Sequence, residues 1–190
     1  MSGPAIFMHS VIAIMIVVSI VCFWMYYGEH TESNGTLWIG VTAFTILYHF
    51  WLRIIMGNVS KLFSKYINYN QWWFKEKNFE KKLYEILNVK NWKRKVLTYN
   101  PELYDLKNNS LEEVVNTTVK SELDHWINEI ISLSTLLFAI PWGEFWIFFI
   151  TAVIAMIFDS QFIVVQRYNR PRVLKLLNRK NNANEKVIKA

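Results

Sequence analysis

Apolar residues gather in long blocks that are separated by polar segments. Residues 4–27 and 37–56 are almost wholly apolar, and each block is close to the ~20 residues that a helix needs to cross a bilayer core of ~30 Å. Residues 126–140 make a shorter block, and residues 146–165 make a full-length one. The pattern predicts an all-α integral membrane protein with about four transmembrane helices, forming a single membrane domain over residues 1–190.

The positive charges avoid two of the connections between these blocks. The chain holds 21 Lys and Arg residues, and neither the connection 28–36 nor the turn near 141–145 contains one. Apart from Arg53, all of them lie in the central segment 57–125 or in the tail 166–190. Short loops rich in Lys and Arg stay on the cytoplasmic side of a membrane. We therefore expect a multi-pass protein of the cell membrane with both termini in the cytoplasm.

The central segment mixes lysines with aromatic residues. Val59–Tyr69 alternates apolar residues with lysines, and Trp72, Trp73 and Phe74 follow directly. Such segments are typical of the headgroup layer, so cytoplasmic interfacial amphipathic helices are expected over 57–125. Charge alone favours simple adhesion to anionic membrane lipid, at about 1 kcal/mol per basic residue, over a groove for an anionic, partly apolar substrate. A surface pressed onto lipid is a poor site for nucleic acid.

Residue types that hold metals and cofactors are sparse. Cys22 is the one cysteine, so it cannot form a disulfide within the chain. The histidines are far apart in sequence, at His9, His30, His49 and His125, and no glycine-rich nucleotide loop is present. The sequence predicts neither a metal site nor a cofactor.

A helix with an unusual carboxylate is predicted after residue 110. Ser110–Glu113 has the pattern of a capping box, which starts a helix. At about 100° per residue, the helix has one apolar stripe, made of Leu111, Val115, Val119 and Trp126. Glu122 falls in the middle of this stripe. His125 lies at its edge, one turn on and within reach of Glu122.

A carboxylate on an apolar face beside a bilayer is costly unless it has a partner. In one interpretation, Glu122 pairs with a basic residue of the tail and stabilises the fold. In the other, Glu122 orients His125 and raises the basicity of its imidazole, which can then take a proton from a hydroxyl at neutral pH. The pattern alone favours neither.

A second polar motif stands where the last apolar block ends. Gln166–Arg172 reads QRYNRPR, and its arginines present donor forks that suit phosphate or carboxylate. The alternative is that these arginines are ordinary anchors at a cytoplasmic helix end. Helical spacing places Asp159 on one face with Ile163, Gln166 and Arg170, and Pro171 is expected to end or kink the helix. The aliphatic part of the Arg53 side chain is expected to lie along the apolar helix, so that the guanidinium reaches the membrane surface.

The motifs follow one another in a recognisable order. Tyr84, Val89, Trp92 and Lys93 come first, then Glu122, His125 and Trp126 in an ExxHW string, then QRYNRPR. This order, over roughly residues 72–179, resembles the glycosyl-4,4'-diaponeurosporenoate acyltransferase family. Its members are small bacterial membrane enzymes that move a fatty acyl group to a sugar hydroxyl of a glycosylated carotenoid. The resemblance implies acyl transfer from a thioester donor to a hydroxyl of a glycolipid-like or lipid-linked acceptor.

The resemblance also implies residue roles and partners. His125 becomes the general base and Glu122 the residue that orients it. The predicted substrate-binding residues are Trp92, Lys93, Trp126, Asp159, Gln166, Arg167, Tyr168, Asn169, Arg170 and Arg172. Arginines of this set would hold the donor's phosphates or the developing oxyanion. The co-substrate is an acyl-CoA or an acyl-carrier-protein thioester, and no cofactor is implied.

One competing class is a non-catalytic membrane adaptor that binds anionic lipid and stabilises a partner enzyme. It predicts that Glu122 and His125 tolerate replacement by Gln as long as the fold survives. The sequence leaves open whether the chain forms a homo-oligomer or binds a membrane enzyme.

Overall fold

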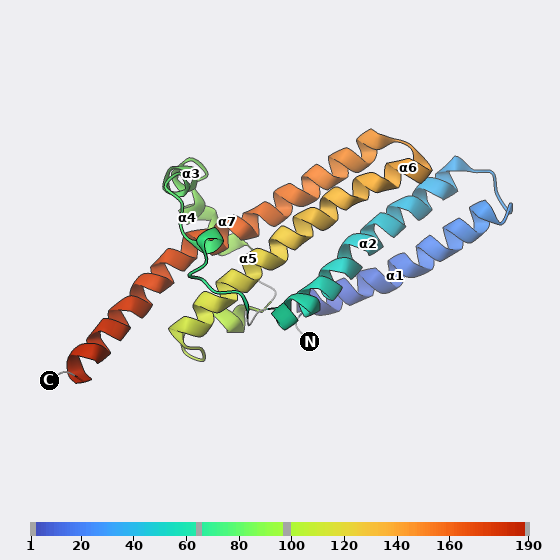
Figure 1. Cartoon of the computed structure of the whole chain (residues 1–190). Coiled ribbons are helices and arrows are strands. Elements are labelled where there is room, and N and C mark those ends of the chain that lie inside the picture. Colours follow the sequence, from blue (N-terminus) through green and yellow to red (C-terminus); the bar gives the residue numbers. More distant parts are fainter. Residues whose placement is uncertain (1–2, 64–65, 97–99, 189–190) are drawn as a thin grey trace.

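The computed structural model describes residues 3–63, 66–96 and 100–188, and this part of the chain is helical and holds no strand. Two long antiparallel hairpins lie side by side (Figure 1). The first joins α1 (Gly3–Tyr27) to α2 (Asn34–Phe63). The second joins α5 (Leu111–Ser134), which continues through η5 (Thr135–Phe138) and α6 (Ala139–Trp142), to α7 (Phe145–Ile188).

Short elements fill the connection between the hairpins. In chain order they are η2 (Trp72–Phe74), α3 (Glu80–Ile86), α4 (Val89–Trp92), η3 (Lys93–Lys95) and η4 (Pro101–Tyr104). They lie beside α5 and α7 near the end at which the long C-terminal part of α7 leaves the bundle (Figure 1).

Three helices are long and apolar enough to cross a membrane. They span Ile6–Tyr27, Asn34–Phe63 and Phe145–Lys186. This confirms the all-α membrane fold. The remaining predicted span, 126–140, is helical and lies along α7, but its helix begins with a polar half. Its crossing of the bilayer therefore stays a prediction.

Close helix contact in the first hairpin depends on Gly40. A Cβ atom added there would come within 3.0 Å of Cβ of Cys22 and within 3.1 Å of the Phe23 ring. The hydroxyl of Ser19 donates to the Gly40 carbonyl at 3.4 Å. Glycine thus lets α1 and α2 approach to a distance that a larger residue would prevent.

The turn of the second hairpin lies where it was predicted. α6 ends at Trp142, and Gly143 and Glu144 both adopt positive φ, of 73° and 51°. The capping box is confirmed as well, because Glu113 N–H donates to Ser110 Oγ at 3.2 Å and Ser110 N–H donates to Glu113 Oε2 at 2.7 Å. The expectation at Pro171 is corrected in part: α7 does not end there but continues to Ile188.

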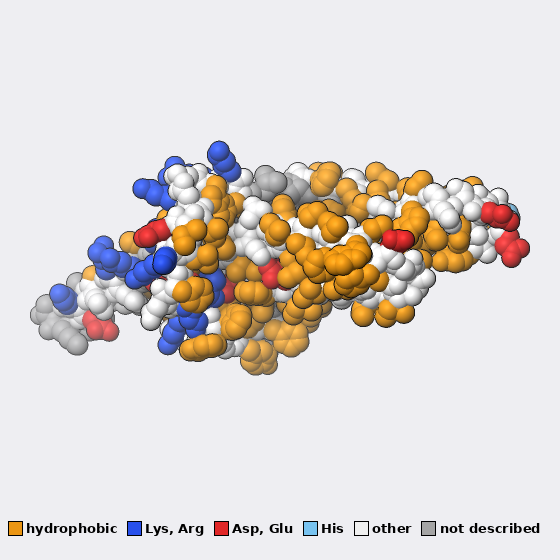
Figure 2. Space-filling view, turned by 90° about the horizontal axis from the view of Figure 1, so that it is seen from above, with side chains coloured by type: hydrophobic (Ala, Val, Ile, Leu, Met, Phe, Trp, Pro, Cys, Tyr) orange, Lys and Arg blue, Asp and Glu red, His pale blue; other side chains and the backbone are white. Residues whose placement is uncertain are grey.

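Charge is separated along the length of the molecule. Figure 2 shows Lys and Arg gathered at one end, apolar side chains over the middle and acidic side chains at the opposite tip. The end rich in Lys and Arg is that of the short helices and the C-terminal part of α7.

Candidate active site

Glu122 pairs with two arginines of the QRYNRPR motif. Its side chain is 0% exposed, and its Oε1 lies 2.6 Å from Nη1 of Arg167. Its Oε2 lies 2.5 Å from Nη2 of Arg170. Trp126 adds a longer hydrogen bond from Nε1 to Oε1, at 3.4 Å. The structure therefore contains the first interpretation of Glu122, a pair with basic residues of the tail. Among the described residues, Glu122 forms no hydrogen bond with His125.

All the N–H groups of the Arg167 guanidinium donate to acceptors within the protein. Its Nε and Nη2 donate to Oε1 of Glu80 at 2.9 and 2.5 Å, and its remaining hydrogens reach the carbonyls of Trp73 and Lys75, each at 3.1 Å, and Glu122. The carboxylates of Glu80 and Glu122 balance its charge. Its five donors are thus occupied, which leaves none for a substrate phosphate.

Arg170 is buried even more deeply, at 1% exposure. It donates to the hydroxyl and the carbonyl of Thr118, at 3.0 and 3.1 Å, and to the carbonyl of Phe74 at 2.9 Å. We call Glu80, Glu122, Arg167 and Arg170 the arginine cluster. It joins α7 to α5 and to the segment 72–80, so it holds the short helices against the bundle.

His125 meets a different carboxylate. Its Nδ1 lies 2.9 Å from Oδ1 of Asp159, which is 2% exposed. Asn128 donates to the same oxygen at 3.2 Å, and Nη2 of Arg53 forms an ion pair with Oδ2. The imidazole stacks on Phe162, with ring centroids 4.4 Å apart. We call Arg53, His125, Asn128 and Asp159 the histidine cluster.

The histidine cluster selects one tautomer of the imidazole. A carboxylate paired with an arginine is ionised and can only accept, so the proton of a neutral His125 sits on Nδ1. The other nitrogen, Nε2, then carries a free lone pair. Among the described residues no side chain or carbonyl forms a hydrogen bond with Nε2. The side chain of His125 is 19% exposed.

The expectation for Arg53 is corrected. Instead of reaching the membrane surface, its guanidinium turns to Asp159, and its side chain is only 18% exposed. The physical reason is that a buried carboxylate in a lipid-embedded helix is stable as an anion only with a positive partner.

A third group of predicted residues lies on the outer side of α7. Lys93 Nζ donates to Oδ1 of Asn169 at 2.7 Å and lies 4.7 Å from the ring centre of Tyr168. The guanidinium of Arg172, an exposed residue, stacks on the same ring at 3.7 Å. We call Lys93, Tyr168, Asn169 and Arg172 the outer cluster. Burial, followed by the charge of Arg172, lowers the pKa of Lys93.

The two remaining predicted residues stand apart from these clusters. Trp92 donates from Nε1 to the carbonyl of Leu87 at 2.7 Å. Gln166 donates to the hydroxyl of Tyr104 at 3.2 Å. The shared face of Asp159, Ile163, Gln166 and Arg170 is confirmed, since all four are buried.

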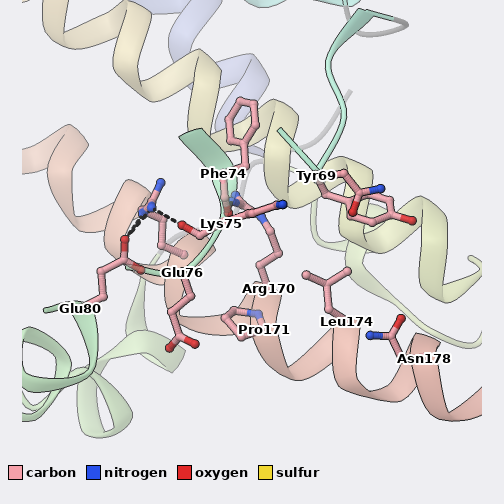
Figure 3. Close-up of a pocket in the computed structure, with 11 residues that line it drawn as sticks. Tyr69, Phe74, Lys75, Glu76, Glu80, Arg170, Pro171, Leu174 and Asn178 are labelled. Carbon is pink, nitrogen blue, oxygen red and sulfur yellow. Dashed lines mark hydrogen bonds and ion pairs between the residues drawn. The ribbon is translucent and has the colours of Figure 1, made fainter. Parts of the chain in front are cut away.

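A small cavity adjoins the arginine cluster. It measures about 210 Å³ and lies between the segment 69–76 and α7. Figure 3 shows Tyr69 and Phe74 on one side of it, with Pro171, Leu174 and Asn178 on α7. Its wall combines apolar and charged side chains.

Several cluster members were missed by sequence reasoning. Glu80 is one carboxylate in a segment rich in lysines, and its position relative to the neighbouring residues did not indicate a buried partner. Asn128 lies one turn after His125 and could have been suspected from that spacing. Arg53 had the clearest signal, because it is the one basic residue in an apolar block. Such a residue indicates a buried partner, which the sequence does not name.

The family model for glycosyl-4,4'-diaponeurosporenoate acyltransferase matches residues 70–179. This range holds the whole arginine cluster and all of the histidine cluster except Arg53. The chain belongs to this family. The resemblance inferred from the motifs is thereby confirmed, and the chain is an acyltransferase of a membrane-associated family.

Relatives of the same description support this membership. The glycosyl-4,4'-diaponeurosporenoate acyltransferases of Staphylococcus aureus strains bovine RF122 / ET3-1 and N315 are each 30% identical to the chain over 153 residues. The enzyme of strain USA300 has the same identity over the same length. Each match covers 74% of this chain and 90% of the relative. No solved structure matches the chain.

Proposed function

We propose that this acyltransferase moves a fatty acyl group from a thioester donor to a hydroxyl of a glycolipid-like or lipid-linked acceptor, with His125 as the general base. The observation that carries the proposal is the 2.9 Å contact between Nδ1 of His125 and Asp159, which leaves Nε2 free. The relatives are named for acyl transfer to a glycosylated carotenoid acid, so an acceptor with a sugar hydroxyl is the first candidate.

The proposed reaction needs only proton movement and positioning from the protein. Nε2 of His125 takes the hydroxyl proton as the acceptor oxygen attacks the thioester carbonyl. The tetrahedral intermediate then collapses, the C–S bond breaks, and the imidazolium returns its proton to the leaving thiolate. One ester and one thiol result, and no electrons are exchanged. General-base catalysis of this kind contributes about 10²- to 10⁴-fold.

Asp159 replaces Glu122 as the residue that acts on His125. As a carboxylate it accepts a hydrogen bond from Nδ1–H and stabilises the imidazolium that forms during the reaction. Glu122 is then a structural member of the arginine cluster. Its two arginines fix the segment 72–80, which borders the proposed site through the edge-on contact of Trp73 with Trp126, at 5.7 Å between ring centroids.

The donor's phosphates are proposed to meet the outer cluster. Arg167 has no donor left, whereas Arg172 is exposed and Lys93 is partly exposed. Both acyl-CoA and an acyl carrier protein present a phosphopantetheine thioester, so one phosphate-binding chemistry serves either donor. Lys93 and Arg172 together give two positive charges beside one aromatic ring.

The charge separation of Figure 2 supports a definite orientation. With the end rich in Lys and Arg in the cytoplasm, both termini are cytoplasmic and the donor arrives from that side. The short helices then lie against the inner leaflet. Trp72, Phe79 and Ile86 are exposed by 72%, 67% and 71%, and lipid is the partner proposed for them.

Comparison of lipid extracts tests the proposal. Membranes with the unmodified enzyme, with His125→Gln and with His9→Gln are brought to equal enzyme levels, and their lipids are compared by untargeted mass spectrometry. His9 is exposed and lies far from the site in sequence, so its variant is the matched control. We expect one lipid class to gain an acyl mass with the unmodified enzyme and the control only. Equal gain with His125→Gln would contradict the role of His125 and favour the adaptor.

A further inference from the structure

The two hairpins meet at a buried ion pair. Nη2 of Arg53, on α2, contacts Oδ2 of Asp159, on α7, which is 2% exposed. Oδ1 of the same carboxylate is held by His125 at 2.9 Å and by Asn128 at 3.2 Å. Both oxygens of Asp159 are therefore engaged, Oδ1 by residues of α5 and Oδ2 by Arg53 of α2. Of these partners, Arg53 is the one that carries a permanent positive charge.

Arg53 is unusual in its position as well as its contact. It lies in the first hairpin, outside the residues 70–179 that the family model matches. Its Nε is buried and has no partner among the described residues. A side chain that served only to anchor α2 at the membrane surface would extend toward water. This guanidinium extends toward one carboxylate instead.

We propose that Arg53 is a positioning residue for the acyl-transfer reaction. It keeps Asp159 ionised and aimed at Nδ1 of His125, so that Nε2 presents its lone pair to the acceptor hydroxyl. The first hairpin thereby completes the active site rather than only anchoring it. This inference rests on the proposed role of His125.

Arg53 places its positive charge directly against the carboxylate that holds His125. Its Nη2 pairs with Oδ2 of Asp159, while Oδ1 of Asp159 meets Nδ1 of His125. Other charged and titratable side chains on these helices have different neighbours. Glu122 is paired with Arg167 and Arg170, Asp124 is paired with Lys120, Glu129 accepts from the hydroxyl of Ser160, and His49 lies one turn before Arg53. Among the described residues, Arg53 is the arginine or lysine that forms an ion pair with Asp159.

The first test compares Arg53→Gln and Arg53→Lys with the unmodified enzyme in proteoliposomes. Release of the thiol from a fatty acyl-CoA is followed at neutral pH, with the acceptor lipids of the native membrane present. We expect Arg53→Gln to lower kcat about 10- to 100-fold with little change in the donor KM. Arg53→Lys should recover most of the rate.

Arg179→Gln is the matched control, because Arg179 is exposed on the distant part of α7. An unchanged kcat in Arg53→Gln, or a loss confined to KM, would overturn the proposal. If instead His125→Gln is fully active, the proposed function itself fails, so the two failures are distinguishable.

A double variant separates positioning from simple stability. Arg53→Gln leaves Asp159 buried and unpaired, which destabilises the fold. Arg53→Gln with Asp159→Asn removes both charges, so its midpoint of thermal unfolding in detergent should return toward that of the unmodified enzyme while its activity stays low. Recovery of activity together with stability would show that Arg53 serves only the fold.

Discussion

His125 and Asp159 meet across the interface of α5 and α7, with 2.9 Å between Nδ1 and Oδ1. Glu122, three residues before His125, turns instead to Arg167 and Arg170. Asp159 and Glu122 therefore have separate partners. Asp159 contacts the proposed base, and Glu122 helps to hold the short helices to the bundle.

Asp159→Asn is expected to lower the transfer rate about 10²- to 10⁴-fold. The amide can donate to Nδ1, which selects the wrong tautomer and removes the charge that stabilises the imidazolium. Thiol release from an acyl-CoA in proteoliposomes measures the effect. Glu185→Gln, at an exposed position of α7, is the control and should keep the full rate. A rate near that of the unmodified enzyme would show that Asp159 does not act on the base.

Glu122→Gln is expected to destabilise the protein by about 3–5 kcal/mol, because the buried Arg170 loses its counter-charge and Arg167 keeps only Glu80. Thermal unfolding in detergent gives the change. Glu113→Gln serves as the control, since it removes only the exposed partner of the capping box and should cause a much smaller shift. A large loss of activity in Glu122→Gln at unchanged stability would return Glu122 to the catalytic role that its ExxH spacing suggested.

Donor binding is expected to weaken at alkaline pH. Burial and the charge of Arg172 lower the pKa of Lys93, so this lysine loses its proton at a lower pH than an ordinary lysine does. Its charge is present below that depressed pKa and is lost as the pH rises through it. The donor KM should therefore rise with pH while kcat changes little. Lys93→Arg should remove this dependence, and Lys175→Arg, at an exposed site, should retain it.

The same cluster makes a prediction at neutral pH. Arg172→Gln should raise the donor KM about tenfold, because one charge-assisted contact to phosphate is worth about 1.5–3 kcal/mol before solvent screening reduces it. Steady-state kinetics with a fatty acyl-CoA give the KM, and Arg179→Gln is the exposed control. An unchanged KM would exclude the outer cluster as the phosphate site.

Membrane orientation is expected to follow the charge separation. In a Cys22→Ser background, Glu32→Cys should react with a membrane-impermeant thiol reagent added to intact cells, since it lies in the acidic connection between α1 and α2. Asn182→Cys, near the end of α7, should react only after the cells are permeabilised. The reverse pattern would invert the proposed topology.

The sequence by itself determined the elements and their exposed or buried faces. Apolar blocks predicted the three spanning helices, the Ser110 and Glu113 pair predicted where α5 begins, and helical spacing placed Asp159 and Arg170 on one buried face. These features depend on contacts between residues a few positions apart, whose geometry a helix dictates. Pro171 was the exception, because α7 continues past it.

Only the tertiary structure decided which charges meet. Glu122 and His125 lie one turn apart on α5. Their spacing does not say which of them faces Asp159 of α7 and which faces Arg167 and Arg170. The choice depends on how far α7 is shifted along α5 and how it is rotated about its axis, and one turn of either helix moves a side chain by about 5.4 Å. That register is set by packing over the whole length of both hairpins. It brings Asp159 to His125, Arg167 and Arg170 to Glu122, and Arg53 from a separate hairpin to Asp159.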